Sequence, residues 1–289
     1  MIKKIFSKKE SVPTEPILIP PSAHCLSRSL ISRQCLIILD TLKAAGFETY
    51  LVGGSVRDLL LGREPKDFDV ATNAKPEEIR RLFRNCRLIG KRFRLAHIYF
   101  KQEIIEVATF RKEGKKGHDQ LKNRDGLLKR DNVYGTLKDD VWRRDFTLNA
   151  LYYDAKSNTI IDHTRGLHDL QQGIIRIIGK AEVRYREDPV RILRAIRFAA
   201  KLGMTLEEDT AKAIAKTHSL LGSIAPARLL DESHKLFNNG NAVNTFAALR
   251  HYEVLQYLYP LTEQALRHPT FHLPADKFIL SALKIPMPE

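Results

Sequence analysis

The chain has 289 residues, 43% of them hydrophobic and 28% charged, which is typical of a globular protein with a sizeable core and two or more modules. Its 48 lysines and arginines outnumber 34 acids and give a formal net charge of +14, which favours a polyanionic partner such as RNA or DNA. No apolar run approaches the length of a membrane span, so no membrane partner is expected. Three widely spaced cysteines without a CxxC pair argue against a disulfide framework or a structural zinc site and indicate a reducing cytoplasm.

A flexible lead-in is predicted over residues 1–30, which are basic at first and then rich in proline. Beyond it, helical and strand-like patterns alternate, with glycine and proline marking their ends. The predicted elements are a helix over residues 32–46, a strand over 47–52, a short helix to 61, a strand over 67–72, a helix over 76–83, and strands over 95–100 and 103–110. Together they predict a small mixed sheet with helices.

Gly53 and Gly54 join the strand over 47–52 to the short helix after it. Without a Cβ, this backbone can turn tightly and bring its N–H groups close to a phosphate. Asp67 and Asp69 are separated by one residue, so on a strand both carboxylates point to the same face. A phosphate turn beside two carboxylates predicts a divalent-metal site for phosphoryl transfer. A solvated turn next to an acidic strand end is the plainer alternative.

Two basic stretches follow. Residues 87–100, RLIGKRFRLAHIYF, predict a glycine-broken strand pair with a basic bend, which by itself is compatible with a solvated hairpin. Residues 111–131 carry eight basic residues and three glycines, and predict a flexible loop. That loop is equally compatible with a lid that contacts RNA or nucleotide phosphates and with a solvated surface loop.

The segment VWRRDFTLNALYYD, residues 141–154, sets Arg143 and Arg144 beside Asp145. These cations need an anion near them, which Asp145, a triphosphate or both could supply.

A helix is predicted over residues 186–203, with Asp188 as its N-cap and Pro189 as its first residue. Its arginines recur every third residue and share one surface. From residue 205 onward helices are expected, and Arg228 and Glu232 are spaced to form an i, i+4 ion pair.

These motifs resemble the nucleotidyltransferases related to DNA polymerase β, and among them the class that includes bacterial poly(A) polymerases and CCA-adding enzymes. The segments GGSVRD, DFDVAT, RRDFTLNA and EDPVRILRAIRF carry the resemblance in the family's order, over roughly residues 31–266. It implies an α/β head of nucleotidyltransferase fold, followed by an all-α neck and a partial helical body. The implied boundaries are 31–154 for the head, 155–238 for the neck with base recognition and RNA binding, and 239–289 for the body.

The resemblance also implies roles for individual residues. Asp67 and Asp69 would bind Mg²⁺, with Mn²⁺ as the alternative ion, and Asp145 would complete the catalytic carboxylates. Glu106, on the strand over 103–110, competes with Asp145 for that third place. The nucleotide would be held by residues for phosphate (Gly53, Gly54, Arg57, Arg144), ribose (Asn149) and base (Asp188, Arg191, with Arg194 on base or phosphate).

The activity implied is template-independent addition of AMP from ATP to RNA 3′ ends by two-metal phosphoryl transfer, as in RNA polyadenylation during mRNA processing and decay. The expected partners are therefore ATP and an RNA 3′ end, in the cytoplasm. The stretch over residues 87–100 is similar to one that separates poly(A) polymerases from their CCA-adding relatives, and it favours polyadenylation. A CCA- or A-adding enzyme for tRNA shares every catalytic motif and stays open, as does a non-catalytic RNA-binding homologue. The resemblance fades after Leu266.

Overall fold

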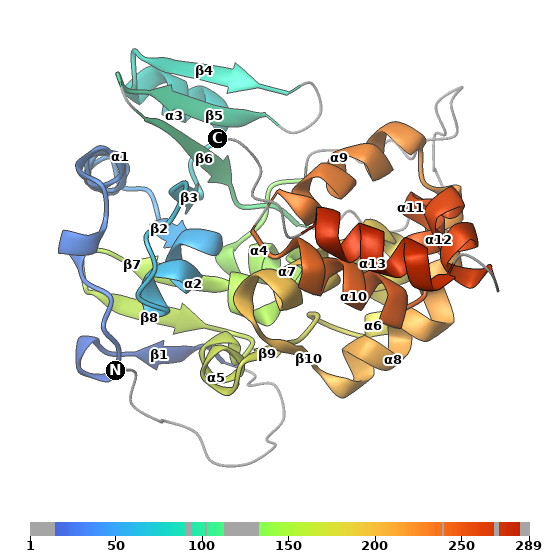
Figure 1. Ribbon diagram of the computed structural model, residues 1–289. Coiled ribbons are helices and arrows are strands. Elements are labelled where there is room, and N and C mark those ends of the chain that lie inside the picture. The colour runs from blue at the N-terminus through green and yellow to red at the C-terminus, as the bar shows by residue number, and fades with distance from the viewer. Residues whose placement is uncertain are drawn as a thin grey trace, which may run out of the picture. The chain divides into compact units, whose positions relative to one another are not determined.

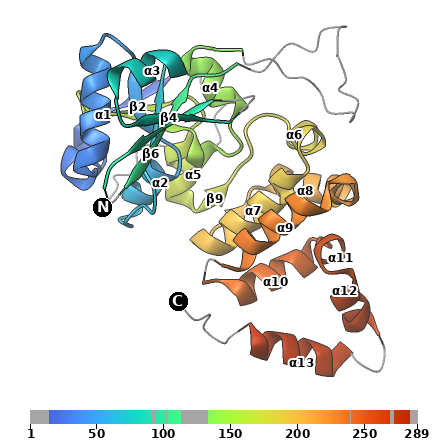
Figure 2. The same ribbon diagram turned by 90° about the horizontal axis from the view of Figure 1, so that it is seen from above.

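The computed structural model describes residues 15–90, 94–101, 103–112, 133–238, 240–268 and 272–283. The chain forms two compact units, Met1–Gln171 and Gln172–Glu289, and each is described by itself (Figures 1 and 2). Most of the basic loop predicted over 111–131, and the bend at residues 91–93, lie outside the described residues. Within the described ranges, every helix is too short or too polar to cross a membrane.

The first unit is built on an eight-stranded mixed sheet with the order β1-β8-β7-β2-β3-β6-β5-β4 (Figure 1). Its strands are β1 Ile17–Ile19, β2 Thr49–Val52, β3 Asp69–Thr72, β4 Cys86–Ile89, β5 Leu95–Tyr99, β6 Ile104–Thr109, β7 Leu151–Asp154 and β8 Thr159–Asp162. Strands β3 and β6 pair in parallel, and the other neighbours pair antiparallel. The predicted mixed sheet with helices is confirmed, and it is larger than expected because β1 and the β7–β8 hairpin extend it.

The three helices predicted for the first unit begin and end close to where the sequence places them, and two further helices follow. They are α1 Arg33–Ala44, α2 Gly54–Leu60, α3 Pro76–Leu82, α4 Leu137–Arg143 and α5 Gly166–Gln172, with the 3₁₀ turns η1 Pro21–Ala23, η2 Arg28–Leu30 and η3 Thr147–Asn149. At the start of α1, the Ser32 hydroxyl accepts a hydrogen bond from the Cys35 N–H (3.2 Å). After it, Gly46 turns the chain away with φ +87°. Local signals therefore suffice to bound these helices.

The lead-in expected over residues 1–30 is ordered where the structure describes it, from residue 15. Strand β1 pairs antiparallel with β8, and Ile19 is buried in the core. The side chain of Arg28 donates to both Asp40 on α1 (2.8 Å) and the Ala155 carbonyl (3.1 Å). This part of the chain is thus a component of the head rather than a flexible segment.

Replacing Gly166 by alanine is expected to destabilise the first unit by about 1–3 kcal/mol, because a methyl group there meets packed backbone. A Cβ built on Gly166 lies only 2.2 Å from the carbonyl oxygen of Thr147, at the start of η3. Urea unfolding would measure the loss. The control is Gly222→Ala, where the Cβ first meets Tyr257 at 3.8 Å. Equal unfolding midpoints for the two variants would contradict the close approach.

The second unit is helical, as the resemblance implies. Its helices are α6 Ala181–Glu187, α7 Val190–Leu202, α8 Glu208–Thr217, α9 Pro226–Phe237, α10 Ala242–His251, α11 Leu255–Leu258, α12 Pro260–Arg267 and α13 His272–Ala282, with the 3₁₀ turn η4 His218–Ser223. A short parallel pair, β9 Ile174–Ile175 and β10 Thr205–Leu206, accompanies them. Helices α7 and α9 lie side by side in Figure 2.

The helix predicted over residues 186–203 is interrupted near its start. Helix α6 ends at Glu187, and α7 begins at Val190. Asp188 between them is extended, with φ −151°, because a residue before proline disfavours the helical conformation. The predicted N-cap role of Asp188 is wrong, because Pro189 holds the N-cap position of α7, although Oδ1 of Asp188 accepts the Val190 N–H (3.3 Å). Pro189 therefore precedes the helix instead of opening it.

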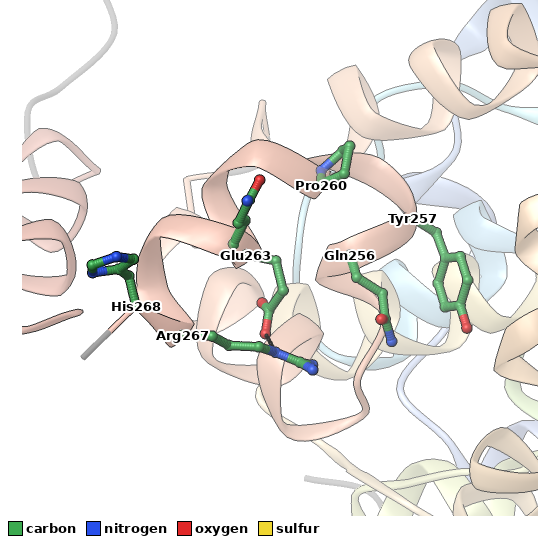
Figure 3. Close-up of a pocket in the computed structure, with 7 residues that line it drawn as sticks. Gln256, Tyr257, Pro260, Glu263, Arg267 and His268 are labelled. Atoms are coloured by element: carbon green, nitrogen blue, oxygen red, sulfur yellow. Dashed lines mark hydrogen bonds and ion pairs between the residues drawn. The ribbon is translucent and has the colours of Figure 1, made fainter. Parts of the chain in front are cut away.

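A cavity of about 590 Å³ lies against α11 and α12 (Figure 3). Arg267 donates to Glu263 in its wall (2.7 Å), and Tyr257 and His268 lie on opposite sides of it. None of the residues that line it belongs to the predicted site.

Candidate active site

The glycine turn lies where β2 ends and α2 begins. Gly53 has φ +73° and ψ −133°, a conformation that strains any residue with a Cβ. A Cβ built there would lie 3.5 Å from Nη1 of Arg144 and 3.8 Å from Oδ2 of Asp69. The glycine turn, Asp69 and Arg144 therefore meet at one point, although Asp69 and Arg144 are 16 and 91 residues from Gly53 in sequence.

The carboxylates lie on the neighbouring strands β3 and β6, where the first residue of β3 stands beside the third residue of β6. Asp69 is the first residue of β3 and pairs in register with Glu106 of β6. Asp67, which was expected on the strand, lies in an exposed bend two residues before it. The reason is that Asp69 pairs with Val52, the last residue of β2, so the β2–β3 ladder stops at the glycine turn.

Electrostatics link these acids. Burial, the charge of Glu106 and the charge of Asp67 raise the pKa of Asp69 to about 6, against the opposing charge of Arg144. A cluster of carboxylates that repel one another in this way is a donor set suited to a hard divalent cation. Among the described residues, no three acids, imidazoles or thiols approach closely enough to enclose a metal by themselves. That agrees with Mg²⁺ sites, which combine one or two carboxylates with water and substrate phosphates.

Asp145 has a different environment from Glu106. Its Oδ1 accepts the Phe146 N–H (2.8 Å) and the side-chain amide of Asn149 (3.3 Å) within its own turn. Glu106 instead adjoins Asp69 on one side and His97 of β5 on the other, with Oε1 3.3 Å from the His97 Nε2. Of the two rivals for the third carboxylate, Glu106 is the one in register with Asp69.

Arg57 and Asn149 contact each other directly. Arg57 is only 3% exposed, and its Nη1 donates to Oδ1 of Asn149 (2.6 Å). Its Nε donates to the neighbouring Asp58 (2.8 Å). Since Asn149 in turn donates to Asp145, a chain of hydrogen bonds joins α2 to η3. These residues fix the backbone around the glycine turn, in addition to any contact with a nucleotide.

Arg144 has two buried partners that the sequence analysis missed, Asp140 and Tyr152. Its Nη2 donates to Oδ2 of Asp140 (3.0 Å), and its Nε donates to the Tyr152 hydroxyl (2.8 Å). Burial alone would raise the pKa of Asp140, but the charges of Arg144 and Arg143 outweigh it and hold that pKa below its ordinary value. The sequence does contain a signal for this ion pairing, because Asp140 precedes Arg143 by three residues and Arg144 by four, as in a helix.

The base-reading residues predicted from the resemblance belong to the second unit. Oδ2 of Asp188 accepts from Nη2 of Arg228 (2.9 Å). The predicted pairing of Arg228 with Glu232 is therefore replaced, and Glu232 accepts from Lys235 instead (2.9 Å). The reason is that α7 and α9 pack together, which brings Arg228 to the Asp188 carboxylate.

Arg191 and Arg194 lie on α7. Nη1 of Arg191 donates to the Arg184 carbonyl (3.0 Å) and to Glu187 (3.2 Å), so its position is fixed from α6. Burial, with the charge of Arg184, lowers the pKa of Arg191. The Arg194 guanidinium lies over the Phe198 ring at 5.6 Å.

Comparisons with known proteins agree with this arrangement. Two family models match: "Poly A polymerase head domain" over residues 49–176, and "Probable RNA and SrmB- binding site of polymerase A" over residues 203–266. Poly(A) polymerase I of Salmonella typhi is 51% identical over 268 residues, which cover 89% of this chain and 58% of that protein. The CCA-adding enzyme of Lactobacillus johnsonii is 42% identical over 201 residues, covering 70% of this chain and 49% of that enzyme.

Among solved structures, the Bacillus stearothermophilus CCA-adding enzyme in complex with CTP is similar, with a TM-score of 0.70 and 35% identity. The match covers 81% of this chain and 56% of that one. The chain thus spans about half the length of these relatives. Its two matched segments contain the glycine turn and the carboxylates in the first and the α8–α12 helices in the second. The chain belongs to the nucleotidyltransferase family that contains the bacterial poly(A) polymerases and the CCA-adding enzymes.

Proposed function

We propose that this protein is a template-independent polynucleotide adenylyltransferase, which transfers AMP from ATP to RNA 3′ ends and releases pyrophosphate. The observation that carries the proposal is the convergence of the Gly53 turn, Asp69 and Arg144 at one point. Phosphoryl transfer needs a backbone turn for phosphate, carboxylates for a cation and a fixed positive charge. The excess of positive charge suits the RNA, and we expect the reaction in the cytoplasm, as the three unpaired cysteines indicate.

Polyadenylation is favoured over CCA addition by the degree of similarity. The Poly(A) polymerase I relative is 51% identical across 89% of the chain, against 42% across 70% for the CCA-adding relative. The stretch over residues 87–100 points the same way. A role in mRNA processing and decay follows as part of the proposal.

The donor set fits a divalent cation, and Mg²⁺ would be held by Asp67 and Asp69 together with water and substrate phosphates, with a third acid beside them. A bound cation would lower the pKa of the attacking RNA 3′-hydroxyl and stabilise the charge on the departing pyrophosphate. We place Glu106 rather than Asp145 in the third position, because Glu106 is in register with Asp69 and shifts its pKa. Arg144 brings a permanent positive charge to the glycine turn, where it would stabilise the triphosphate. The catalytic role of Asp145 stays a prediction.

Selection of adenine is assigned to Asp188 and Arg191. A carboxylate accepts from the adenine amino group and a guanidinium donates to its ring nitrogens, so the pair complements that edge of the base. Both side chains are held by neighbours, Asp188 by Arg228 and Arg191 by Glu187. Held side chains lose less conformational freedom on binding, which favours selectivity.

Primer extension with single nucleotides tests the activity. With a short RNA, Mg²⁺ and one nucleoside triphosphate at a time, we expect long extension with ATP alone. A tRNA lacking its 3′ end is the second substrate, and ordered addition of two C residues and one A would assign the protein to the CCA-adding enzymes instead. No incorporation of any nucleotide, with RNA binding retained, would favour a non-catalytic RNA-binding protein.

A further inference from the structure

We infer that Asp140 and Tyr152 are positioning residues that fix the Arg144 guanidinium for the triphosphate. The inference rests on the proposed function, and it concerns two residues that flank the segment RRDFTLNA, which contains Arg144. Arg144 is held on three sides: by Asp140 at Nη2 (3.0 Å), by the Tyr152 hydroxyl at Nε (2.8 Å) and by the Asn149 carbonyl at Nη1 (3.3 Å). The guanidinium also lies over the Tyr152 ring, 5.0 Å from its centroid.

Asp140 is itself fixed, which makes it a firm anchor. It is 1% exposed, and Tyr152 donates to its Oδ2 (2.5 Å). Its Oδ1 accepts the Arg111 backbone N–H (3.1 Å) and the Arg143 side chain. Both carboxylate oxygens are thus occupied from several elements, so the anchor cannot turn without breaking buried hydrogen bonds.

The Tyr152 hydroxyl has a double role that phenylalanine cannot fill. It accepts from Arg144 and donates to Asp140, so it closes a ring of three groups. Without the Tyr152 hydroxyl the guanidinium is held less firmly, and Asp69, whose carboxylate lies at the same glycine turn, competes with Asp140 for it. If Arg144 paired with Asp69, it could no longer bind the triphosphate, and it would occupy the carboxylate that the cation needs. The ring of three groups therefore keeps Arg144 available for the triphosphate and Asp69 available for the cation.

Neighbouring tyrosines on β7 provide a matched pair of variants. Tyr152 and Tyr153 are both fully buried and point to opposite faces of the sheet. The Tyr153 hydroxyl donates to the side chain of Asn158 (2.7 Å), in the β7–β8 turn. Phenylalanine preserves the packing of Tyr152 against Tyr50 and Phe110. Each Tyr→Phe change therefore removes one buried hydroxyl, but only Tyr152→Phe touches Arg144.

The experiment measures steady-state extension of an RNA primer at varied ATP concentration. We expect Tyr152→Phe to raise KM for ATP about tenfold, as for loss of one hydrogen bond to a charged group, with a smaller change in kcat. Tyr153→Phe should leave both constants near wild type. Asp140→Asn, which keeps the shape but removes the charge, should act in the same direction as Tyr152→Phe. In an Arg144→Ala background, Tyr152→Phe should change kcat/KM no further.

Each outcome decides between the alternatives. Equal KM values for Tyr152→Phe and Tyr153→Phe would overturn the inference, as would a full additional loss from Tyr152→Phe in the Arg144→Ala background. Absence of ATP incorporation by the wild-type protein would overturn the proposed function itself, and fluorescence titration with an ATP analogue would then test the Tyr152 effect on binding.

Discussion

Asp69→Asn is expected to abolish nucleotide incorporation while leaving primer binding nearly unchanged. Asparagine keeps the shape of the side chain but loses the charge that would hold a cation beside Glu106. A catalytic cation contributes several kcal/mol to the transition state, which is about a thousandfold or more in rate. Primer extension measures the loss, and RNA gel shift in the absence of ATP measures binding. A parallel loss of RNA binding would mean that Asp69 is structural.

The same variant should be more stable than wild type when divalent cations are chelated. The native pKa of Asp69 is raised to about 6 from an ordinary value of 3.8, so between these values the native state holds a proton that the unfolded chain has released. Stability therefore falls as pH rises through this window, and the ionised carboxylate destabilises the protein above it. Removing the charge should recover about 1–2 kcal/mol at pH 8, allowing for screening by solvent, and almost nothing at pH 4.

Asp154→Asn is the matched control, with the opposite sign. Burial alone would raise the pKa of Asp154, but the Lys43 ion pair and hydrogen bonds hold it below its ordinary value. Its charge thus stabilises the native state at neutral pH and stops doing so as the carboxylate becomes protonated in acid. Thermal unfolding in EDTA should show a rise for Asp69→Asn and a fall for Asp154→Asn at pH 8. Added Mg²⁺ should then stabilise the wild type but not Asp69→Asn. Destabilisation by both changes would contradict the repulsion at Asp69.

Glu106→Gln is expected to weaken activation by metal, whereas Asp145→Asn is not. Glu106 adjoins Asp69 across the β3–β6 pair, while Asp145 bonds to Phe146 and Asn149 in its own turn. Loss of one of the acids around the cation should raise the Mg²⁺ concentration for half-maximal activity about tenfold or more and lower the maximal rate. Titration of primer extension with Mg²⁺ separates this effect from a change in ATP affinity.

For Asp145→Asn we expect a changed KM for ATP with an unaltered Mg²⁺ midpoint, because its hydrogen bond orients Asn149, which holds Arg57. A shifted Mg²⁺ midpoint in Asp145→Asn, with none in Glu106→Gln, would return the third position to Asp145. Equal shifts in both would place four acids around the cation.

The sequence predicts the glycine turn, the strand that carries Asp69 and the first helices well, because each depends on neighbours within a few residues. Gly53 requires a positive φ, and Ser32 caps α1 from the adjacent position. Strand β1 could not be found in this way, since Ile17–Ile19 stand among prolines and gain their partner about 140 residues later. Pairing across such distances depends on the whole sheet and leaves no local pattern.

The candidate site shows the same limit. The choice between Glu106 and Asp145 as the third carboxylate depends on the register of β3 with β6. The spacing of residues within each segment of the sequence does not reveal that register. The sequence predicts that Arg228 pairs with Glu232 along its own helix. Packing of α9 against α7 instead brings Arg228 to the carboxylate of Asp188, which is more exposed than that of Glu232. The sequence does not single out Asp140, although its helical spacing to Arg143 and Arg144 is visible. Its hydrogen bond to Tyr152 forms only because β7 brings Tyr152 next to it.

The parallel pairing of β3 with β6 has a consequence for how this family diverges. Parallel neighbours need a crossover between them, and here the crossover consists of α3, β4 and β5. The stretch over residues 87–100 therefore forms nearly half of the chain that runs from one acid strand to the other. Its last part, β5, is in register with Glu106 at His97. Because β3 and β6 pair directly, a change within this crossover that keeps the register of β5 with β6 leaves Asp69 and Glu106 adjacent.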